Sequence, residues 1–390
     1  MSDSSARDDV PRVALVTYST KPRGGVVHTL SLADALVDRN LPVRIVALGD
    51  PDQDFFRPVR APYSTVPTSP PADTLEQRVF DSIDDLEAGL SKIADEVDIL
   101  HTQDCISARA AARVRDAGAE VRVVRTVHHV DDFTTQALID CQRRAIEEPD
   151  RLVVVSQDWH QRLRADYGVD ARVIHNGVDA DRFAPIGTGR RAAVRDRTGV
   201  ADRFVFLSVG GIEPRKGSSF LVQAMARLKA QPDLRPVLVV VGGHSFQDYR
   251  DYRDAVLATL PGLGLELGRD ILMAGSLSDA DLHEWYRSAD ALVFPSLKEG
   301  WGLAVLEAMA ADLPVVSSDI TVLREYLTAD RTAVMTRAGD PESLATGMRR
   351  VATDRELRET LVHGGRELIR DFSWERTAKQ HARLYAEMSR

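Results

Sequence analysis

The feature that most constrains the fold of this chain is a repeated alternation of short, almost uninterrupted apolar runs with longer helical patterns. In the first half the apolar runs predict buried strands at residues 12–18, 42–49, 98–104, 119–130, 150–156 and 171–179. Between them apolar residues recur at helical spacing, as over 26–40 and 75–97. Strands that are apolar on both faces and separated by helices indicate a parallel sheet covered by helices on each side.

The same alternation starts again after a segment rich in Pro, Gly and Arg near 184–200. The second series predicts strands at 203–211, 236–243, 270–276, 290–296 and 313–318, with helices at 218–231 and 279–289. A chain of 390 residues is long enough for two such cores. We therefore expect an α/β protein with two Rossmann-like, doubly wound domains, 1–188 and 189–372. A separate terminal helix is expected over 373–390, with Ser373 as its N-cap.

Composition excludes several classes of protein. The net charge of −9 argues against a nucleic-acid partner, because phosphate contacts need a basic face. Cys105 and Cys141 form neither a metal-binding pattern nor a disulfide framework. Segment 1–10 is polar and acidic, unlike a signal peptide, and no apolar run approaches about 20 residues, so a cytoplasmic location is predicted. The arginines of 142–151 could contact an anionic membrane weakly, but interleaved acids favour a solvated face.

A glycine pair follows the first predicted strand, at the edge of the sheet where open α/β sheets bind ligands. Gly24 and Gly25 would let the backbone approach a phosphate at a helix N-terminus, where free N–H groups favour an anion. The segment does not match G-x-G-x-x-G, and an ordinary tight turn explains the two glycines equally well. We interpret Arg23 and His28 as solvated residues on the helix face.

The strand that opens the second domain ends in GGIEPRKG, residues 210–217. Glycines, two adjacent cations and a following helix suit a diphosphate, with Lys216 as a point charge and Arg215 as a bidentate donor. A solvated basic turn is the alternative for this loop taken alone.

A second glycine turn in the same domain carries two glutamates. In EGWG, Gly300 and Gly302 keep the approach to a helix N-terminus clear, which predicts another anion-binding turn. Glu307 follows in an apolar helix, where a carboxylate needs a partner, and a ribose diol would supply one. Glu299, at the lip of the turn, could accept hydrogen bonds from sugar hydroxyls. Alternatively, Glu307 pairs with a structural arginine and Glu299 is solvated.

These motifs together resemble those of family 4 glycosyltransferases, which are retaining enzymes with the GT-B fold. EGWGLAVLE, from Glu299 to Glu307, is similar to the family's E-x7-E signature. Residues 209–217 resemble its diphosphate loop, 173–183 its motif before the interdomain linker, and 125–133 its loop carrying a histidine. The resemblance runs from the first strand to the FSW that begins the terminal helix, and is therefore far more specific than any single motif.

The resemblance implies a nucleotide sugar, UDP- or GDP-linked, as co-substrate, with no permanently bound cofactor and no metal. Domain 189–372 would bind this donor, and domain 1–188, on which the terminal helix would pack, would bind a hydroxyl acceptor of unknown type (small molecule, lipid-linked or glycan). Transfer of a hexose would retain configuration, by same-face attack with the leaving phosphate assisting. The donor residues implied are Gly25, Arg215, Lys216, Glu299, Gly300, Trp301, Gly302, Leu303 and Glu307, and the catalytic residues implied are His128 and Glu299. His128 is preferred to His129 because it is closer to the expected strand end.

One position departs from the family pattern. Many relatives have arginine directly after the first glycine of the diphosphate loop, where this chain has Gly211. Either Arg215 replaces that charge or phosphate binding is weaker. The D-x-D sequences at 179–181 and 279–281 spell a metal–diphosphate motif of other glycosyltransferases. The first falls in the NGVD segment that resembles the family's motif and the second at an expected helix start, so capping explains them better.

Three other functions remain compatible with the pattern. A phosphorylase on the same fold would need pyridoxal phosphate, and a nucleotide-sugar epimerase would share the donor loops. A protein that binds nucleotide sugars without turnover is the third, and the presence of Lys216, Glu299 and Glu307 together argues against it.

Overall fold

The computed structural model describes residues 10–70, 72–243 and 249–388, so the acidic segment 1–10 lies almost wholly outside the described residues. The chain divides into two compact units. Unit 1 runs to Gly177 and resumes at Trp374, and unit 2 comprises Val178–Ser373. The domain boundary expected after residue 188 falls at the start of helix α7 (Thr188–Arg197), inside unit 2. None of the described helices combines the length and the apolar character needed to cross a bilayer.

Unit 1 contains a parallel sheet with the order β3-β2-β1-β4-β5-β6-β7. Its strands are β1 (Val13–Thr17), β2 (Val43–Leu48), β3 (Tyr63–Val66), β4 (Ile99–Thr102), β5 (Arg122–Val127), β6 (Arg151–Val154) and β7 (Arg172–Val173). This arrangement confirms the doubly wound sheet expected for the first half. Strand β3 was not expected, because its sequence YSTV is half polar and it lies at the edge of the sheet.

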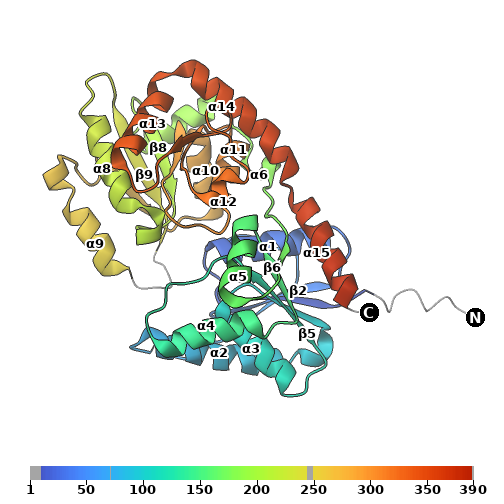
Figure 1. The fold of residues 1–390 in the computed structure, drawn as a ribbon. Coiled ribbons are helices and arrows are strands. Elements are labelled where there is room, and N and C mark those ends of the chain that lie inside the picture. The colour runs from blue at the N-terminus through green and yellow to red at the C-terminus, as the bar shows by residue number, and fades with distance from the viewer. Residues whose placement is uncertain (1–9, 71, 244–248, 389–390) are drawn as a thin grey trace, which may run out of the picture. The chain divides into compact units, whose positions relative to one another are not determined.

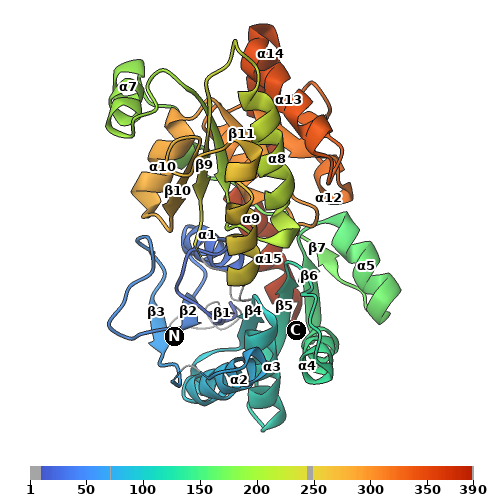
Figure 2. The ribbon, with the colours of Figure 1, turned by 90° about the vertical axis from the view of Figure 1, so that its left-hand side faces the viewer.

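Helices cover both faces of the unit 1 sheet. They are α1 (Gly24–Val37), α2 (Leu75–Ser91), α3 (Cys105–Asp116), α4 (Gln136–Glu147), α5 (Gln157–Tyr167) and α15 (Trp374–Met388). Helices α1 and α15 pack against each other on one face, whereas α2, α3 and α4 lie together on the other (Figures 1 and 2). The terminal helix therefore belongs to unit 1, although the whole of unit 2 precedes it in the chain.

Unit 2 repeats this plan in its described residues, with the strand order β10-β9-β8-β11-β12-β13. The strands are β8 (Phe204–Val209), β9 (Pro236–Val241), β10 (Ile271–Gly275), β11 (Ala291–Phe294), β12 (Val315–Ser318) and β13 (Val334–Thr336). The helices are α6 (Ala180–Phe183), α7, α8 (Ser218–Lys229), α9 (Arg250–Ala258), α10 (Asp279–Ser288), α11 (Leu303–Ala310), α12 (Thr321–Arg324), α13 (Pro341–Thr353) and α14 (Arg355–Leu368).

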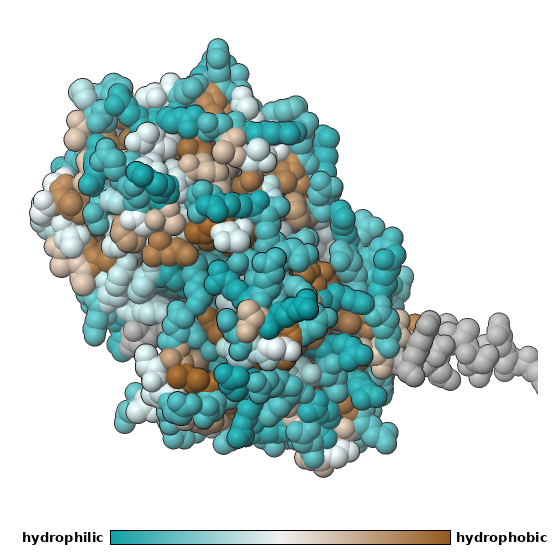
Figure 3. Space-filling view, viewed as in Figure 1, coloured by the Kyte–Doolittle hydropathy of each residue, from teal (hydrophilic) through white to brown (hydrophobic). Residues whose placement is uncertain are grey.

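In both sheets the strand order reverses beside the first strand, between β1 and β4 in unit 1 and between β8 and β11 in unit 2. Such a switch point separates the loops that follow the two strands and leaves room for a ligand at the carboxyl edge. The surface is mostly polar, with apolar side chains scattered over the face seen in Figure 3. The functional loops should therefore be sought at the two switch points.

Candidate functional site

In unit 2 the loops after β8 and β11 are joined by backbone contacts. The first loop holds a short 3-10 turn, Pro214–Lys216, and its Arg215 carbonyl accepts a hydrogen bond of 2.8 Å from the Leu297 N–H. Gly217 follows with φ +67°, and a Cβ there would lie 2.1 Å from the Pro295 carbonyl oxygen. Only glycine permits this approach, so the structure brings together the two loops that the sequence singled out.

The main contact between these loops is an ion pair. Lys216 Nζ lies 2.5 Å from Glu299 Oε1, and Ser296 Oγ donates to the same oxygen at 2.8 Å. Arg215 Nη1 is 3.7 Å from that oxygen. Burial alone would raise the pKa of Glu299, but the charges of Lys216 and Arg215 and these hydrogen bonds outweigh it, and the pKa lies below its ordinary value. Glu299 is thus an ionised acceptor rather than a solvated side chain.

The turn before α11 presents backbone N–H groups. Gly302 has φ +99°, and a Cβ there would lie 2.9 Å from the Tyr326 hydroxyl, which donates to the Trp301 carbonyl at 2.9 Å. The Trp301 ring packs on the Tyr326 ring, 4.7 Å between centroids, so it belongs to the core of unit 2 and only its backbone faces the turn. The N–H groups of Leu303 and Ala304 begin the helix and have no intrahelical partner. An anion can be bound there.

Glu307, one turn into α11, is held by a tyrosine. Tyr286 donates to Glu307 Oε2 at 2.6 Å. Burial raises the pKa of Glu307, with a contribution from Asp279, and the hydrogen bond from Tyr286 and the charge of Arg182 only partly offset this effect. Arg182 itself pairs with Asp279, so the structural arginine considered for Glu307 is engaged elsewhere. Glu307 Oε1 makes no hydrogen bond to any residue that the structure describes.

The structure explains why position 211 lacks an arginine. A Cβ at Gly211 would lie 2.7 Å from the Gly243 carbonyl oxygen, because the ends of β8 and β9 pack backbone against backbone. No side chain fits there. Arg215 contacts Glu213 at 3.0 Å as well as approaching Glu299, so its charge is shared between two carboxylates.

In unit 1 the residues singled out meet at the switch point. A Cβ on Gly25, at the start of α1, would lie 3.6 Å from His128 Cδ2. His128 Nε2 is 3.0 Å from Oε1 of Gln103, a residue that the sequence analysis missed, since a lone glutamine after a strand carries no signal. Burial, and then the positive charge of neighbouring His129, lower the pKa of His128 to about 3. His129 is exposed and lies 3.4 Å from Asp131.

His28 was expected on a solvated helix face, and this expectation was wrong. Its side chain is fully buried, with Nδ1 2.8 Å from Asn176 Oδ1, because α15 covers that face of α1. The His28 ring meets the His128 ring edge-on, 4.7 Å between centroids. Two further buried histidines, His101 and His381, have ring centroids 5.4 Å apart. Burial lowers the pKa values of all four histidines, so unit 1 holds a cluster of neutral imidazoles.

The D-x-D sequences serve local structure. Asp179 caps α6 by accepting from the Arg182 N–H at 3.0 Å. In the second, Ser278 rather than an aspartate is the N-cap of α10, and Asp279 pairs with Arg182. Within the described ranges no cluster of three or more His, Cys, Asp or Glu side chains could hold a metal.

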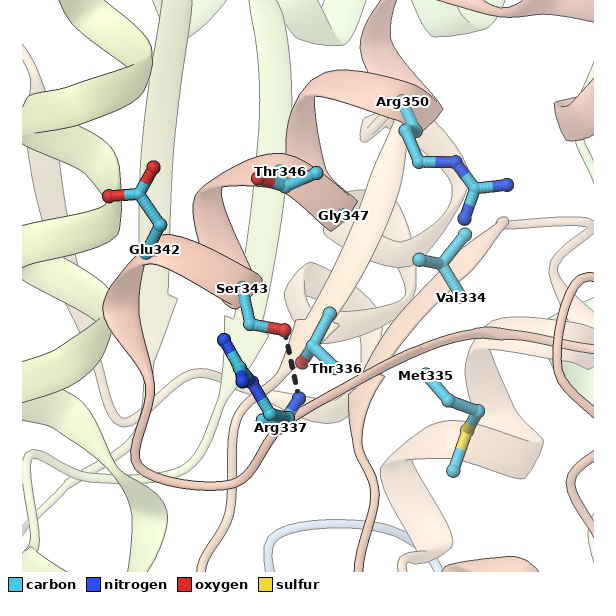
Figure 4. A pocket seen from close by; sticks show the side chains of 9 residues that line it. All are labelled: Val334, Met335, Thr336, Arg337, Glu342, Ser343, Thr346, Gly347 and Arg350. Carbon is cyan, nitrogen blue, oxygen red and sulfur yellow. Dashed lines mark hydrogen bonds between the residues drawn. The ribbon is translucent and has the colours of Figure 1, made fainter.

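A cavity of about 320 Å³ opens between β13 and α13, away from both switch points (Figure 4). Its two arginines are already paired, Arg350 with Asp330 at 3.0 Å and Arg337 with Asp340 at 2.7 Å. It therefore offers no uncompensated charge and is no rival to the loops described above.

Comparison with known proteins agrees with this geometry. Residues 22–182 match the family described as Glycosyltransferase Family 4, and residues 191–368 match Glycosyl transferases group 1. A D-inositol 3-phosphate glycosyltransferase from Geodermatophilus obscurus is 33% identical over 317 residues, which cover 74% of this chain and 66% of that protein. Its counterpart from Saccharomonospora viridis is 33% identical over 311 residues, covering 74% and 70%. Anabaena HepE in complex with UDP and glucose has a TM-score of 0.80 at 20% identity, covering 96% and 99%.

The two sheets, the matched families and the named relatives define a class of enzyme, the glycosyltransferases of the GT-B fold. Within that class the chain belongs to glycosyltransferase family 4. The predicted fold class, family and transferase activity are confirmed.

Proposed function

We propose that this glycosyltransferase moves a hexose from a UDP- or GDP-linked donor to a hydroxyl acceptor, with retention of configuration and without a metal. In this proposal unit 2 binds the donor and unit 1 binds the acceptor. The single observation that carries it is the joined pair of loops in unit 2, in which Lys216 and Glu299 meet beside the open N-terminus of α11.

The donor would be bound along these loops. The N–H groups of Gly302 and Leu303, with the Gly300 backbone leaving room, would bind the diphosphate, whose second charge Lys216 would neutralise. Lys216 has three donors and spends one on Glu299, so two remain for phosphate oxygens. Glu299 would accept from the transferred sugar, and Oε1 of Glu307 would accept from the ribose.

The leaving group would be stabilised electrostatically. Cleavage of the anomeric C–O bond leaves negative charge on the diphosphate, and preorganised N–H groups and a lysine lower the energy of that state. Glu299 is a poor general base, because its pKa lies below the ordinary value, and it is committed to Lys216 and Ser296. The departing phosphate oxygen would therefore take the acceptor's proton on the same face, which gives retention.

From unit 1, Gly25 and His128 are proposed to contribute to the reacting end of the donor. The low pKa of His128 keeps the imidazole neutral at physiological pH. With Nε2 directed at Gln103 Oε1, the ring would carry its proton there and offer Nδ1 as an acceptor for a hydroxyl. The name of these relatives makes D-inositol 3-phosphate the first acceptor to test.

The substitution Glu299→Gln tests whether Glu299 binds the transferred sugar. Nucleoside diphosphates and their sugars are first screened by thermal shift, and the best donor is then assayed for hydrolysis and transfer. We expect transfer and hydrolysis to fall about 100-fold or more while nucleoside diphosphate binding changes less than about threefold. The matched control is Glu342→Gln, an exposed glutamate of unit 2 that pairs with Arg227. Equal loss of binding and transfer in Glu299→Gln would contradict the assignment, and an inverted product would contradict same-face attack. The donor base and the cytoplasmic location stay predictions.

A further inference from the structure

Arg125 is a buried arginine with no polar partner in the part of the chain that the structure describes. Its side chain lies on β5 with 2% of the residue exposed, and its Nε and Nη1 atoms are sealed from solvent. Among the residues that the structure describes, none makes a hydrogen bond or ion pair with this guanidinium. Native proteins normally satisfy buried charged groups with several hydrogen bonds. An arginine left in this state requires an explanation.

The direction of Arg125 follows from the register of β5. Side chains alternate along a strand, and Val124 packs in the core cluster with α1 and α15, whereas Val127 packs with α4 and α5. Arg125 therefore shares the face of Val127, under helices α3 and α4. Its Cα pairs with Thr102, the last residue of β4, so the long side chain starts level with the loop that leads into α3.

The start of α3 is the part of unit 1 that faces this guanidinium. The carboxyl groups of Asp104 and Asp131 act electrostatically on Arg125, and both Asp104 and Cys105 are half-buried rather than sealed. As the first residues of the helix, Cys105 and Ile106 have N–H groups without an intrahelical partner. The start of α3 therefore offers two N–H donors on the same face of the sheet as this buried cation, beside residues that are only partly buried.

The nearby carboxylates are committed to other groups. Asp104 Oδ1 accepts from the Ser107 N–H at 2.7 Å, and its Oδ2 accepts from the Tyr18 N–H at 3.0 Å. Asp131 lies 3.4 Å from His129 Nε2. Neither carboxylate lies within 4.0 Å of the Arg125 guanidinium. Each therefore acts on the positive charge from a distance and does not form an ion pair with it.

We propose that Arg125, with the N–H groups of Cys105 and Ile106, forms a subsite for an anionic group, a phosphate or a carboxylate, carried by the acceptor. This inference rests on the proposed function, in which unit 1 binds the acceptor, and names the chemical class of that acceptor. A guanidinium suits either anion because both offer two oxygens to its planar donors.

Binding of inorganic phosphate to the full chain tests the subsite without any turnover. Because the donor loops also bind phosphate in our proposal, the titration is made in a Lys216→Met background at constant ionic strength, by calorimetry and thermal shift. We expect phosphate to bind, and Arg125→Met to weaken it at least about 30-fold. The matched control is Arg109→Met, a second nearly buried arginine of unit 1 that already pairs with Glu148.

Cys105→Asp keeps the test decisive if Arg125→Met does not fold. An acidic residue in the first turn of a helix is favourable, so this variant should fold, yet its carboxylate would occupy the anion position. Gln157→Asp adds the same charge to the first turn of α5 and serves as its control. Loss of phosphate binding in Cys105→Asp alone supports the subsite, whereas equal binding in both variants overturns it.

Acceptor pairs then distinguish the two sources of the anion. Polyols are compared with their phosphates, and hexoses with their uronic acids, in transfer reactions with the best donor. We expect one anionic series to exceed its neutral partners at least about 30-fold in kcat/KM, and this preference to vanish in Cys105→Asp but to persist in Gln157→Asp. Transfer to neutral and anionic partners at equal rates would overturn the proposal but leave the proposed function standing. Loss of donor hydrolysis in the wild type would contradict the proposed function instead.

Discussion

The two sheets of this protein share one strand order but hold opposite kinds of chemistry at their switch points. In unit 2 the polar groups are charged and paired, as Lys216 and Glu299 are at 2.5 Å. In unit 1 neutral histidines meet instead, His28 fully buried and His128 partly buried, with their rings 4.7 Å apart. Topology therefore decides where each site lies, whereas the residues at the strand ends decide its chemistry.

The loops at the two switch points also differ in how tightly they pack. In unit 2 a Cβ on Gly217 would lie 2.1 Å from a backbone oxygen, so the loops after β8 and β11 are in direct backbone contact. In unit 1 a Cβ on Gly25 would make only ordinary contacts, at 3.6 Å from His128. The site in unit 2 is thus preorganised, whereas the site in unit 1 has room for a small group between Gly25 and His128.

The largest expected effect concerns the charged site. Lys216→Met should lower the rate of transfer about 100- to 1,000-fold, because a preorganised cation near the leaving phosphate is lost. Steady-state kinetics would measure the loss. Lys229→Met is the control, since Lys229 also pairs with a buried carboxylate of unit 2, Asp270 at 2.7 Å, away from these loops. If both variants lost activity equally, the role of Lys216 would be structural.

Acid should expose the difference between the two units. Burial lowers the pKa of His381 in the folded protein to about 4, below its unfolded value near 6.5. The neutral ring of His381 therefore costs the folded protein nothing above about pH 6.5. As the pH falls below 6.5 the folded protein loses stability relative to the unfolded chain, and the loss reaches about 2 kcal/mol at pH 5. His381→Leu should flatten the dependence of the free energy of unfolding of unit 1 on pH between 7 and 5. His363→Leu, at an exposed position, should leave the slope unchanged.

A smaller effect is expected at Glu307. The amide in Glu307→Gln would keep a hydrogen bond to Tyr286 but lose the charge that strengthens bonds to hydroxyls, so donor affinity should fall about tenfold. Calorimetry with a nucleoside diphosphate and its 2′,3′-dideoxy analogue would show the cause. The wild type should bind the ribose form more tightly than the dideoxy form, and the variant should bind both equally. If the variant kept the preference, the assignment of Glu307 to the ribose would be contradicted.

The smallest effect on stability should come from Gly25→Ala. Its new methyl group would sit in ordinary contact with His128, and we expect the free energy of unfolding to change by less than about 0.5 kcal/mol while transfer falls. Gly217→Ala, with positive φ and a backbone oxygen at 2.1 Å, should cost more than about 1 kcal/mol. Denaturant titrations would measure the free energy of unfolding of both variants. A larger loss in Gly25→Ala than in Gly217→Ala would contradict the difference in packing between the two switch points.

The alternation of apolar strands with helical patterns was sufficient to predict both sheets except for an edge strand of each, β3 and β13. That pattern is local in sequence, as are the glycine turns that drew attention to Lys216, Glu299 and Glu307. Strand β13, three residues at the edge of its sheet, was too short to give a period. The pairing of Lys216 with Glu299 joins loops far apart in the chain, so no local pattern could show it.

The burial of individual polar residues was the least predictable property. His28 contacts Trp374 and His381 of α15 and also His128 after β5, and these contacts with distant segments remove it from solvent. Arg125 sits in an apolar strand, where the sequence offers no sign that its guanidinium lacks a partner among the described residues. Both cases depend on contacts with segments that are distant in sequence, and so on the tertiary structure.

The return of α15 to unit 1 has a consequence for the order of events during synthesis. Residues up to 177 leave the ribosome long before residues 374–388, which supply Tyr385 to His101 at 2.6 Å and cover His28. Unit 2 is continuous in the chain and can complete its core first, whereas the earlier-made unit must wait with an apolar helix face uncovered. The half of the protein that is translated first is therefore the half that finishes folding last.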